Sequence, residues 1–92
     1  MLIIIKSAPD TPEGKRGISL AGRMGADVVL LQDAVRFAAK EKKLQTGGRV
    51  YMLEEDAARL LGAGETAPEV LRISYGGFVD LLASQDKVQG MF

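Results

Sequence analysis

The chain has no cysteine and no histidine among its 92 residues. Persulfide and thiol nucleophiles, Cys/His zinc sites, histidine general bases and histidine-containing triads all need one of these two residues. The chain therefore cannot perform such chemistry by itself. It also cannot form a disulfide bond, which is compatible with a cytoplasmic protein, and we expect a cytoplasmic location.

Long apolar runs and an excess of charge of one sign are also missing. The apolar start at 1–6 is too short for a signal peptide, and no run approaches the length of a membrane span. Twelve basic and twelve acidic residues cancel, so no overall field attracts nucleic acid or a membrane surface. We expect neither partner. The chain also has no phosphate-binding loop of the G-x-x-x-x-G-K-[ST] type, and we expect no cofactor and no metal.

The stretch that organises the rest is 28–35, where a four-residue apolar run ends at Gln32 and Asp33 and apolar residues resume at helical spacing. A run that is apolar on both faces is typical of a central strand covered by helices on either side. Asp33 suits the N-cap of the following helix, because its carboxylate can accept a backbone N–H bond at the positive end of the helix dipole. Open α/β sheets collect ligands beyond such strand ends.

The alternation of strand and helix continues along the chain. Thr11 is the predicted cap of the first helix, with Pro12 at its first position and Gly25 as the residue that ends it. We expect residues 86–92 to form a short edge strand or an arm. Strands are predicted over 2–5, 26–31, 49–53 and 70–74, and helices over 12–24, 33–44, 54–61 and 75–83. This order predicts one α/β domain over 1–92, with a mostly parallel sheet of four or five strands and right-handed crossovers.

The carboxyl ends of the predicted strands share one rim of the sheet. This rim would gather four pairs of neighbouring residues: Lys6 and Ser7, Gln32 and Asp33, Glu54 and Glu55, and Ser74 and Tyr75. Acids and a lysine on one rim could bind a metal ion or a polar ligand. The simpler interpretation, which we favour, is that the acids begin helices and are otherwise solvated. Gln32, Asp33, Glu54 and Tyr75 are the candidate ligand-facing or partner-facing residues.

Three apolar residues are candidates for contacts between subunits. Phe37 in the second helix fits the core and a subunit contact equally well, since aromatic residues are enriched in interfaces. Met91 and Phe92 are too apolar for a free tail and are expected to dock on the same chain or on a partner. If they form an interface, removing them or mutating Phe37 should weaken assembly and leave the monomer folded.

Four segments resemble one protein family. Residues 30–35, LLQDAV, resemble the L-L-Q-D-G-V segment of the DsrH/TusB family of sulfur-relay subunits. Residues 50–56, VYMLEED, resemble its V-Y-A-L-x-E-D segment, and residues 73–81, ISYGGFVDL, resemble its I-x-Y-x-x-F-V-x-L segment. Residues 90–92 stand where the family usually ends in an aromatic residue. The likeness covers nearly the whole chain and is weakest over 7–25.

The resemblance implies a flavodoxin-like, DsrE-like three-layer sandwich. It also implies a complex with related DsrE/TusD-type and DsrF/TusC-type subunits, in which a cysteine of the DsrE/TusD-type subunit carries sulfur as a persulfide. That sulfur passes to tRNA 2-thiouridine synthesis or to sulfur oxidation. Because this chain has no cysteine, the resemblance implies a non-catalytic role. The alternative is a stand-alone homo-oligomer that binds a small ligand, or acts as an enzyme, at the rim around Gln32 and Asp33.

Overall fold

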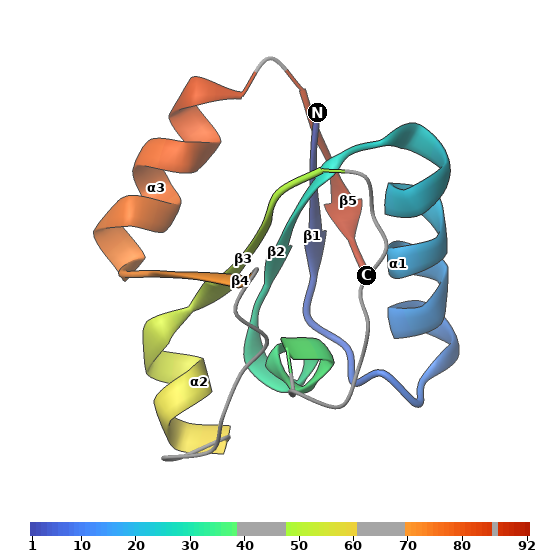
Figure 1. The fold of residues 1–92 in the computed structure, drawn as a ribbon, viewed down its shortest axis with the longest axis horizontal. Helices are drawn as coiled ribbons and strands as arrows, with labels where there is room; N and C mark the ends of the chain where they lie inside the picture. Colours follow the sequence, from blue (N-terminus) through green and yellow to red (C-terminus); the bar gives the residue numbers. More distant parts are fainter. Residues whose placement is uncertain (39–47, 61–69, 86) are drawn as a thin grey trace.

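The computed structural model describes residues 1–38, 48–60, 70–85 and 87–92, and Figure 1 shows its ribbon. Strands and helices alternate along the chain, as the hydrophobic pattern predicts. The elements are β1 (Leu2–Ile5), α1 (Pro12–Met24), β2 (Asp27–Leu30), η1 (Gln32–Ala38), β3 (Val50–Leu53), α2 (Glu54–Leu60), β4 (Val70–Ile73), α3 (Tyr75–Ser84) and β5 (Val88–Met91).

The five strands form one sheet in the order β4-β3-β2-β1-β5, and every neighbouring pair is parallel. The predicted α/β class and parallel sheet are therefore confirmed, and the sheet takes the five-stranded form. The order differs from the 2-1-3-4-5 order of flavodoxin, because β1 to β4 follow one another across the sheet and only β5 returns to the other side of β1.

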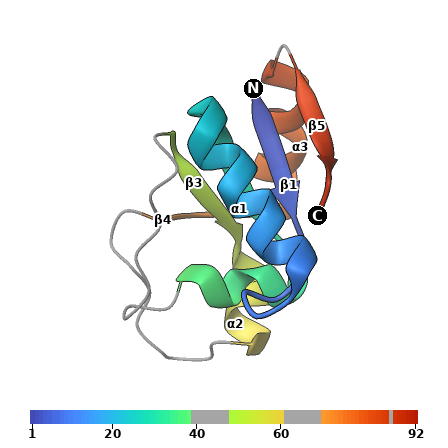
Figure 2. The same ribbon diagram turned by 90° about the vertical axis from the view of Figure 1, so that its right-hand side faces the viewer.

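This strand order decides which helices share a face of the sheet. Right-handed crossovers that always advance in one direction place their helices on one face, and a crossover in the reverse direction places its helix on the other. Accordingly, α1, η1 and α2 contribute to the apolar cluster on one face, and α3 packs against the cluster on the other. Figures 1 and 2 show α1 and α3 on opposite sides of the strands, which makes three layers.

Helix α1 begins and ends where its sequence predicts. The Thr11 hydroxyl accepts a hydrogen bond from the Gly14 backbone N–H at 3.1 Å, which satisfies one of the free donors of the first turn. Pro12 occupies the first position, and Gly25 ends the helix in the left-handed conformation with φ 60°. A threonine cap, an early proline and a closing glycine thus fix both ends of this element.

The central strands β1 and β2 form the middle of the core. The side chains of Leu2, Ile3, Ile5 and Val29 are fully buried, which confirms the prediction that these strands are covered on both faces. The larger cluster lies on the α1 face, and the smaller one lies under α3. Alternate strand residues enter one cluster or the other, since successive side chains point to opposite faces.

The element after β2 differs from the helix predicted over 33–44. It is a 3-10 helix over Gln32–Ala38, and residues 39–47 lie outside the described part of the chain. It begins one residue before Asp33, and its first turn closes through a bond from the Ala34 N–H to the Leu31 carbonyl at 3.0 Å. The prediction that Asp33 caps this element is therefore wrong: Asp33 is its second residue.

The C-terminal segment docks on its own chain. β5 pairs with β1, the Phe92 N–H donates to the Ile4 carbonyl at 3.0 Å, and the Phe92 carbonyl accepts from the Ser7 N–H at 3.2 Å. The Phe92 ring is half-buried and packs against the α1-face cluster, where Gly17 leaves room for it. Of the two predicted forms of this tail, the edge strand is the one observed.

Candidate functional site

The structure places the predicted rim residues at the carboxyl ends of parallel strands and brings only two of them into one pocket. Gln32 and Asp33 line it, whereas Glu54 and Tyr75 do not. Glu54 is the exposed first residue of α2, and Tyr75 is the first residue of α3 with 61% of its surface exposed. The rim is therefore divided, with the Gln32 pocket at one place and Tyr75 at another.

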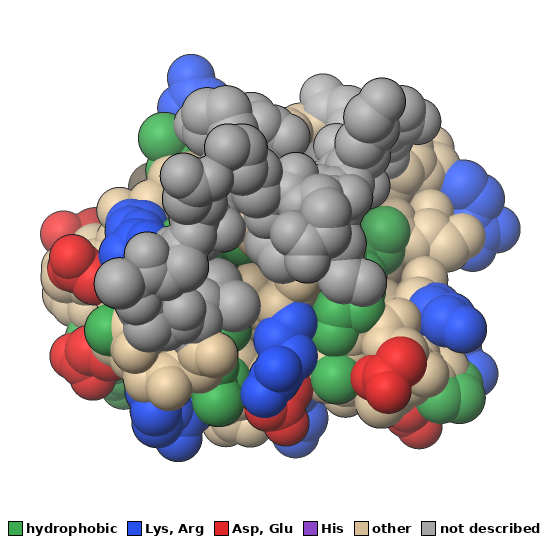
Figure 3. All heavy atoms as spheres, turned by 60° about the horizontal axis from the view of Figure 1, so that its bottom comes forward, with side chains coloured by type: hydrophobic (Ala, Val, Ile, Leu, Met, Phe, Trp, Pro, Cys, Tyr) green, Lys and Arg blue, Asp and Glu red, His purple; other side chains and the backbone are tan. Residues whose placement is uncertain are grey.

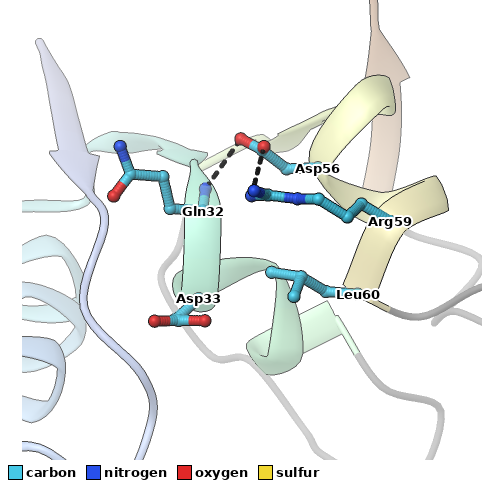
Figure 4. A pocket seen from close by; sticks show the side chains of 5 residues that line it. All are labelled: Gln32, Asp33, Asp56, Arg59 and Leu60. Carbon is cyan, nitrogen blue, oxygen red and sulfur yellow. Dashed lines mark hydrogen bonds and ion pairs between the residues drawn. The ribbon is translucent and has the colours of Figure 1, made fainter.

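The pocket has a volume of about 380 Å³ and opens to solvent. Its walls come from the start of η1 and from the face of α2 that turns toward it. The lining residues are Gln32, Asp33, Asp56, Arg59 and Leu60. Figure 4 shows Asp56 and Arg59 reaching toward the backbone of Gln32, while the Gln32 side chain points away from them and Asp33 lies apart.

Asp56 joins the two walls of the pocket. One carboxylate oxygen, Oδ2, accepts the Gln32 backbone N–H at 2.8 Å, and the other, Oδ1, pairs with Nη2 of Arg59 at 2.9 Å. The Asp56 side chain is 15% exposed and that of Arg59 is 63% exposed, so the aspartate is the less exposed partner of the pair. Asp56 therefore fixes the turn after β2 against α2, and Arg59 follows one helical turn later.

Gln32 itself has an unusual backbone conformation. Its φ is +51°, the left-handed region, and among the described non-glycine residues only Gln32 has a positive φ. This conformation costs an ordinary residue about 1–2 kcal/mol. The hydrogen bond that the Gln32 N–H donates to the Asp56 carboxylate offsets part of this strain. Backbone strain of this kind clusters at functional sites, and the Gln32 side chain points outward from this turn.

Charge on this side of the molecule is mixed. Figure 3 shows acidic and basic side chains interspersed over the face at the strand ends, in the part that the structure describes. The pocket itself has two carboxylates and one guanidinium. Away from the pocket, the pKa of exposed Arg49 is raised, first by the hydrogen bond and charge of Tyr51 and then by the charge of Asp27.

The structure adds two residues that the sequence did not single out. In the sequence, Asp56 is one of three acids at the start of a predicted helix, and nothing in the pattern assigns a role to Arg59. The signal that could have found them is the i,i+3 spacing of an acid and a base on a helix directly after β3, the strand next to β2. Strand order had to be known first, because it alone brings residue 56 beside residue 32.

The predicted interface residues lie as follows. Phe37 is 7% exposed and packs within the α1-face cluster. Of the two positions predicted for this residue, core and subunit contact, it therefore occupies the core. Phe92 is held by its own chain, so removing it affects the fold as well as any assembly. The side chain of Met91 lies outside the described part of the structure.

The described residues show neither a cluster of metal ligands nor a membrane-spanning helix. Among the described residues, no group of three or more Asp or Glu side chains gathers where it could hold a metal ion. No helix in residues 1–38, 48–60, 70–85 or 87–92 is long and apolar enough to cross a membrane.

Comparison with known proteins agrees with the fold and the segment pattern. The model of the family described as DsrH-like protein matches residues 15–88. The crystal structure of the ychN protein from E. coli is similar, with a TM-score of 0.81 and 16% sequence identity, over 99% of this chain and 97% of that one. At this identity the likeness shows a common fold. Among curated protein sequences, none matches the chain.

Proposed function

The chain belongs to the DsrH-like family, and from this premise we propose that it is a non-catalytic subunit of a sulfur-relay complex. The observation that supports this role is the composition: the chain has no cysteine to hold a persulfide and no histidine to move a proton. Sulfur carried by such a complex would reside on a cysteine of another subunit. The chain would complete the assembly and shape the surface around that cysteine.

The proposed partners are related small subunits of the DsrE/TusD and DsrF/TusC types in the cytoplasm. The relay would supply sulfur for tRNA 2-thiouridine synthesis or take part in sulfur oxidation. Neither role requires this subunit to touch nucleic acid, in keeping with its net charge of zero. The rim residues Gln32, Asp33, Glu54 and Tyr75 are the proposed partner-facing or ligand-facing residues.

The test is purification of the tagged chain from its native cell, followed by mass spectrometry of the intact complex. We expect two other small subunits, at least one with a cysteine that becomes persulfidated when a sulfur donor is added. Loss of that cysteine should abolish sulfur transfer by the complex. Recovery of this chain alone, as a monomer or a homo-oligomer, would refute the relay role.

A second function is favoured by the pocket at Gln32 and Asp33. A cavity of about 380 Å³ with carboxylates, a guanidinium and an amide side chain at its edge could hold a small polar ligand. In that case the chain would be a small-ligand-binding domain, or an enzyme restricted to carboxylate, tyrosine and lysine chemistry.

The second function is tested by thermal melting in the presence of metals, nucleotides and thiol-sulfur donors. A bound ligand at a hundred times its Kd should stabilise the chain by about 2.7 kcal/mol. Asp33→Ala should remove that stabilisation without lowering the melting temperature of the free chain, because Asp33 is exposed. A melting temperature that no compound changes would count against this function.

A further inference from the structure

The pocket between η1 and α2 contains two side chains of opposite charge that do not pair with each other. Asp33 contributes a carboxylate from η1, and Arg59 contributes a guanidinium from α2. Arg59 forms its ion pair with Asp56, which lies one turn earlier on the same helix. Among the described residues, none bonds to the Asp33 carboxylate. The pocket therefore keeps an unpaired acid apart from a base.

Arg59 is oriented by Asp56 and keeps donors for a ligand. Its Nη2 bonds to Oδ1 of Asp56 at 2.9 Å, while Oδ2 of the same carboxylate accepts the Gln32 N–H at 2.8 Å. A guanidinium has five N–H donors in a planar fork and can bind a carboxylate through two of them at once. Figure 4 shows Arg59 reaching from α2 toward the start of η1. Arg59 thus gives the pocket a positioned site for a negative group.

Asp33 gives the pocket a site for a positive group. Asp56 uses both of its oxygens within the chain, so Asp33 is the lining carboxylate that stays open to a ligand. An ionised carboxylate accepts hydrogen bonds and donates none, and an ammonium group supplies both the donors and the opposite charge. In Figure 4 the Asp33 carboxylate lies apart from Arg59. The two charges can therefore bind different groups of one molecule.

Size and the rest of the lining restrict the ligand further. The volume of about 380 Å³ lies near the lower end of the range for small-molecule pockets. Leu60 supplies an apolar contact for a short carbon chain, and the exposed Gln32 amide can donate and accept hydrogen bonds. None of the described lining residues is aromatic, so they offer no ring on which a nucleobase would stack.

Simple ions fit this set of charges less well. Two carboxylates against one guanidinium give the described lining a net negative charge, which opposes phosphate and other multiply charged anions. A divalent cation needs several oxygen ligands, and Asp33 is the single lining carboxylate that is open to it. A molecule with one positive and one negative group matches both open sites and brings no net charge.

We propose that the pocket between η1 and α2 binds a small zwitterion of the amino-acid type, with its carboxylate on Arg59 and its ammonium on Asp33. This inference rests on the second function proposed above, that of a small-ligand-binding domain, and names the ligand class of that site. It does not depend on the relay role.

The test follows the backbone amide signals of Gln32 and Asp33 by NMR while the chain is titrated with amino acids. The compounds are α-amino acids and ω-amino acids, in which a longer chain separates the two charges. Each compound that binds is compared with its N-acetyl derivative, which has no ammonium, and with its amide, which has no carboxylate. Because each derivative loses charged hydrogen bonds, we expect it to bind at least about tenfold more weakly.

Two variants assign each half of the ligand to one residue. In Asp33→Asn, acetylation of the ligand should no longer weaken binding, and in Arg59→Gln, amidation should no longer weaken it. A general disturbance of the pocket would instead weaken binding of all three compounds alike. Asp80→Asn on α3 and Arg16→Gln on α1 remove the same charges at exposed positions outside the pocket, and every affinity should stay unchanged.

A further variant covers the case in which Arg59→Gln lowers the melting temperature. Arg59→Lys keeps the positive charge and loses the planar fork. It should therefore weaken binding of the free amino acid more than binding of its amide. Equal effects on the two compounds would refute the contact between Arg59 and the carboxylate.

The outcomes separate this inference from the function on which it rests. If a metal ion, a nucleotide or phosphate shifts the Gln32 and Asp33 signals and no amino acid does, the small-ligand function stands and the zwitterion is refuted. If amino acids bind but acetylation weakens binding equally in Asp33→Asn and in the original chain, the proposed placement of the ligand is refuted. If no compound shifts these signals, both proposals are refuted.

Discussion

At the scale of single residues, the turn after β2 combines a strained backbone with a side chain that holds it. Gln32 has a positive φ that glycine would adopt without steric cost, and Asp56 reaches across from α2 to accept its N–H. The glutamine side chain itself points away from Asp56 and Arg59 (Figure 4). Because the Gln32 side chain is exposed, this strained conformation is better explained by a role at the surface than by stability.

Substitutions at Gln32 should separate strain from side-chain function. Gln32→Gly removes the strain but adds flexibility to the unfolded chain, so we expect stability within about 0.5 kcal/mol of the original. Gln32→Val should destabilise the chain by about 1–2 kcal/mol, because a β-branched residue tolerates a left-handed backbone poorly. Urea unfolding measures both. Equal stability of the two variants would show that the backbone strain is absent.

Asp56 should matter more than the acid beside it. Asp56→Ala removes the bonds to the Gln32 N–H and to Arg59, and we expect a loss of about 1–2 kcal/mol because both bonds involve a charged group in a partly exposed site. Glu55→Ala, at an exposed position one residue earlier, should stay within about 0.5 kcal/mol. Similar losses of stability for the two variants would mean that negative charge at the start of α2, and not the bond from the Gln32 N–H to Asp56, stabilises the chain.

At the scale of elements, α1 lies close to β1 and to Phe92 because residue 17 of α1 is a glycine, which has no side chain. A Cβ added at Gly17 would lie 2.9 Å from Cγ1 of Ile5 and 2.9 Å from Cβ of Phe92. The glycine weakens the helix by itself, since alanine is the better helix former. Its presence in the middle of α1 therefore follows from packing and not from helix propensity.

Gly17→Ala should destabilise the chain by about 1–3 kcal/mol, since an added methyl group in a filled site forces the neighbours to move. The matched control is Gly76→Ala in α3, where the nearest atom, the Ser74 Oγ, is 3.9 Å away. That change should stabilise the chain by about 0.5–1 kcal/mol through helix propensity. Thermal unfolding of both variants tests this pair, and a stabilising Gly17→Ala would contradict the close packing.

The sequence predicts the elements well and their arrangement less well. The span of α1, its threonine cap and its closing glycine follow from local rules, and β1 follows from a short apolar run. The 3-10 form of η1 does not follow from them, because its apolar spacing is also that of an α-helix. The pairing of Asp56 with Gln32 depends on strand order, which joins residues far apart in the chain and leaves no local pattern.

At the scale of the whole molecule, the strand order leaves the two faces of the sheet unequally covered. One face has α1, η1 and α2, and the other has α3, which contains no buried residue. β1 and β2 lie in the centre, paired on both sides. Resistance to local opening should therefore differ across the molecule, since it follows burial and the number of packed neighbours.

Hydrogen exchange should reveal this difference. The amides of β1 and β2 should exchange most slowly, and those of α3 should exchange faster than those of α1, which has three buried residues. Equal protection of α1 and α3 in the isolated chain would show that α3 is packed more firmly than its exposure indicates.

The position of β5 beside β1 also affects how the molecule is made. Leu2 of β1 pairs with Asp27 of β2 and with Val88 of β5. The two strands that flank β1 are therefore synthesised at very different times. While the ribosome produces residues up to β5, one edge of β1 has no strand to pair with, and Phe92 is not yet there to pack beside Gly17. An uncovered edge of isoleucines is prone to join other chains. Until β5 closes the sheet, this edge of the nascent chain is open to pairing with other chains.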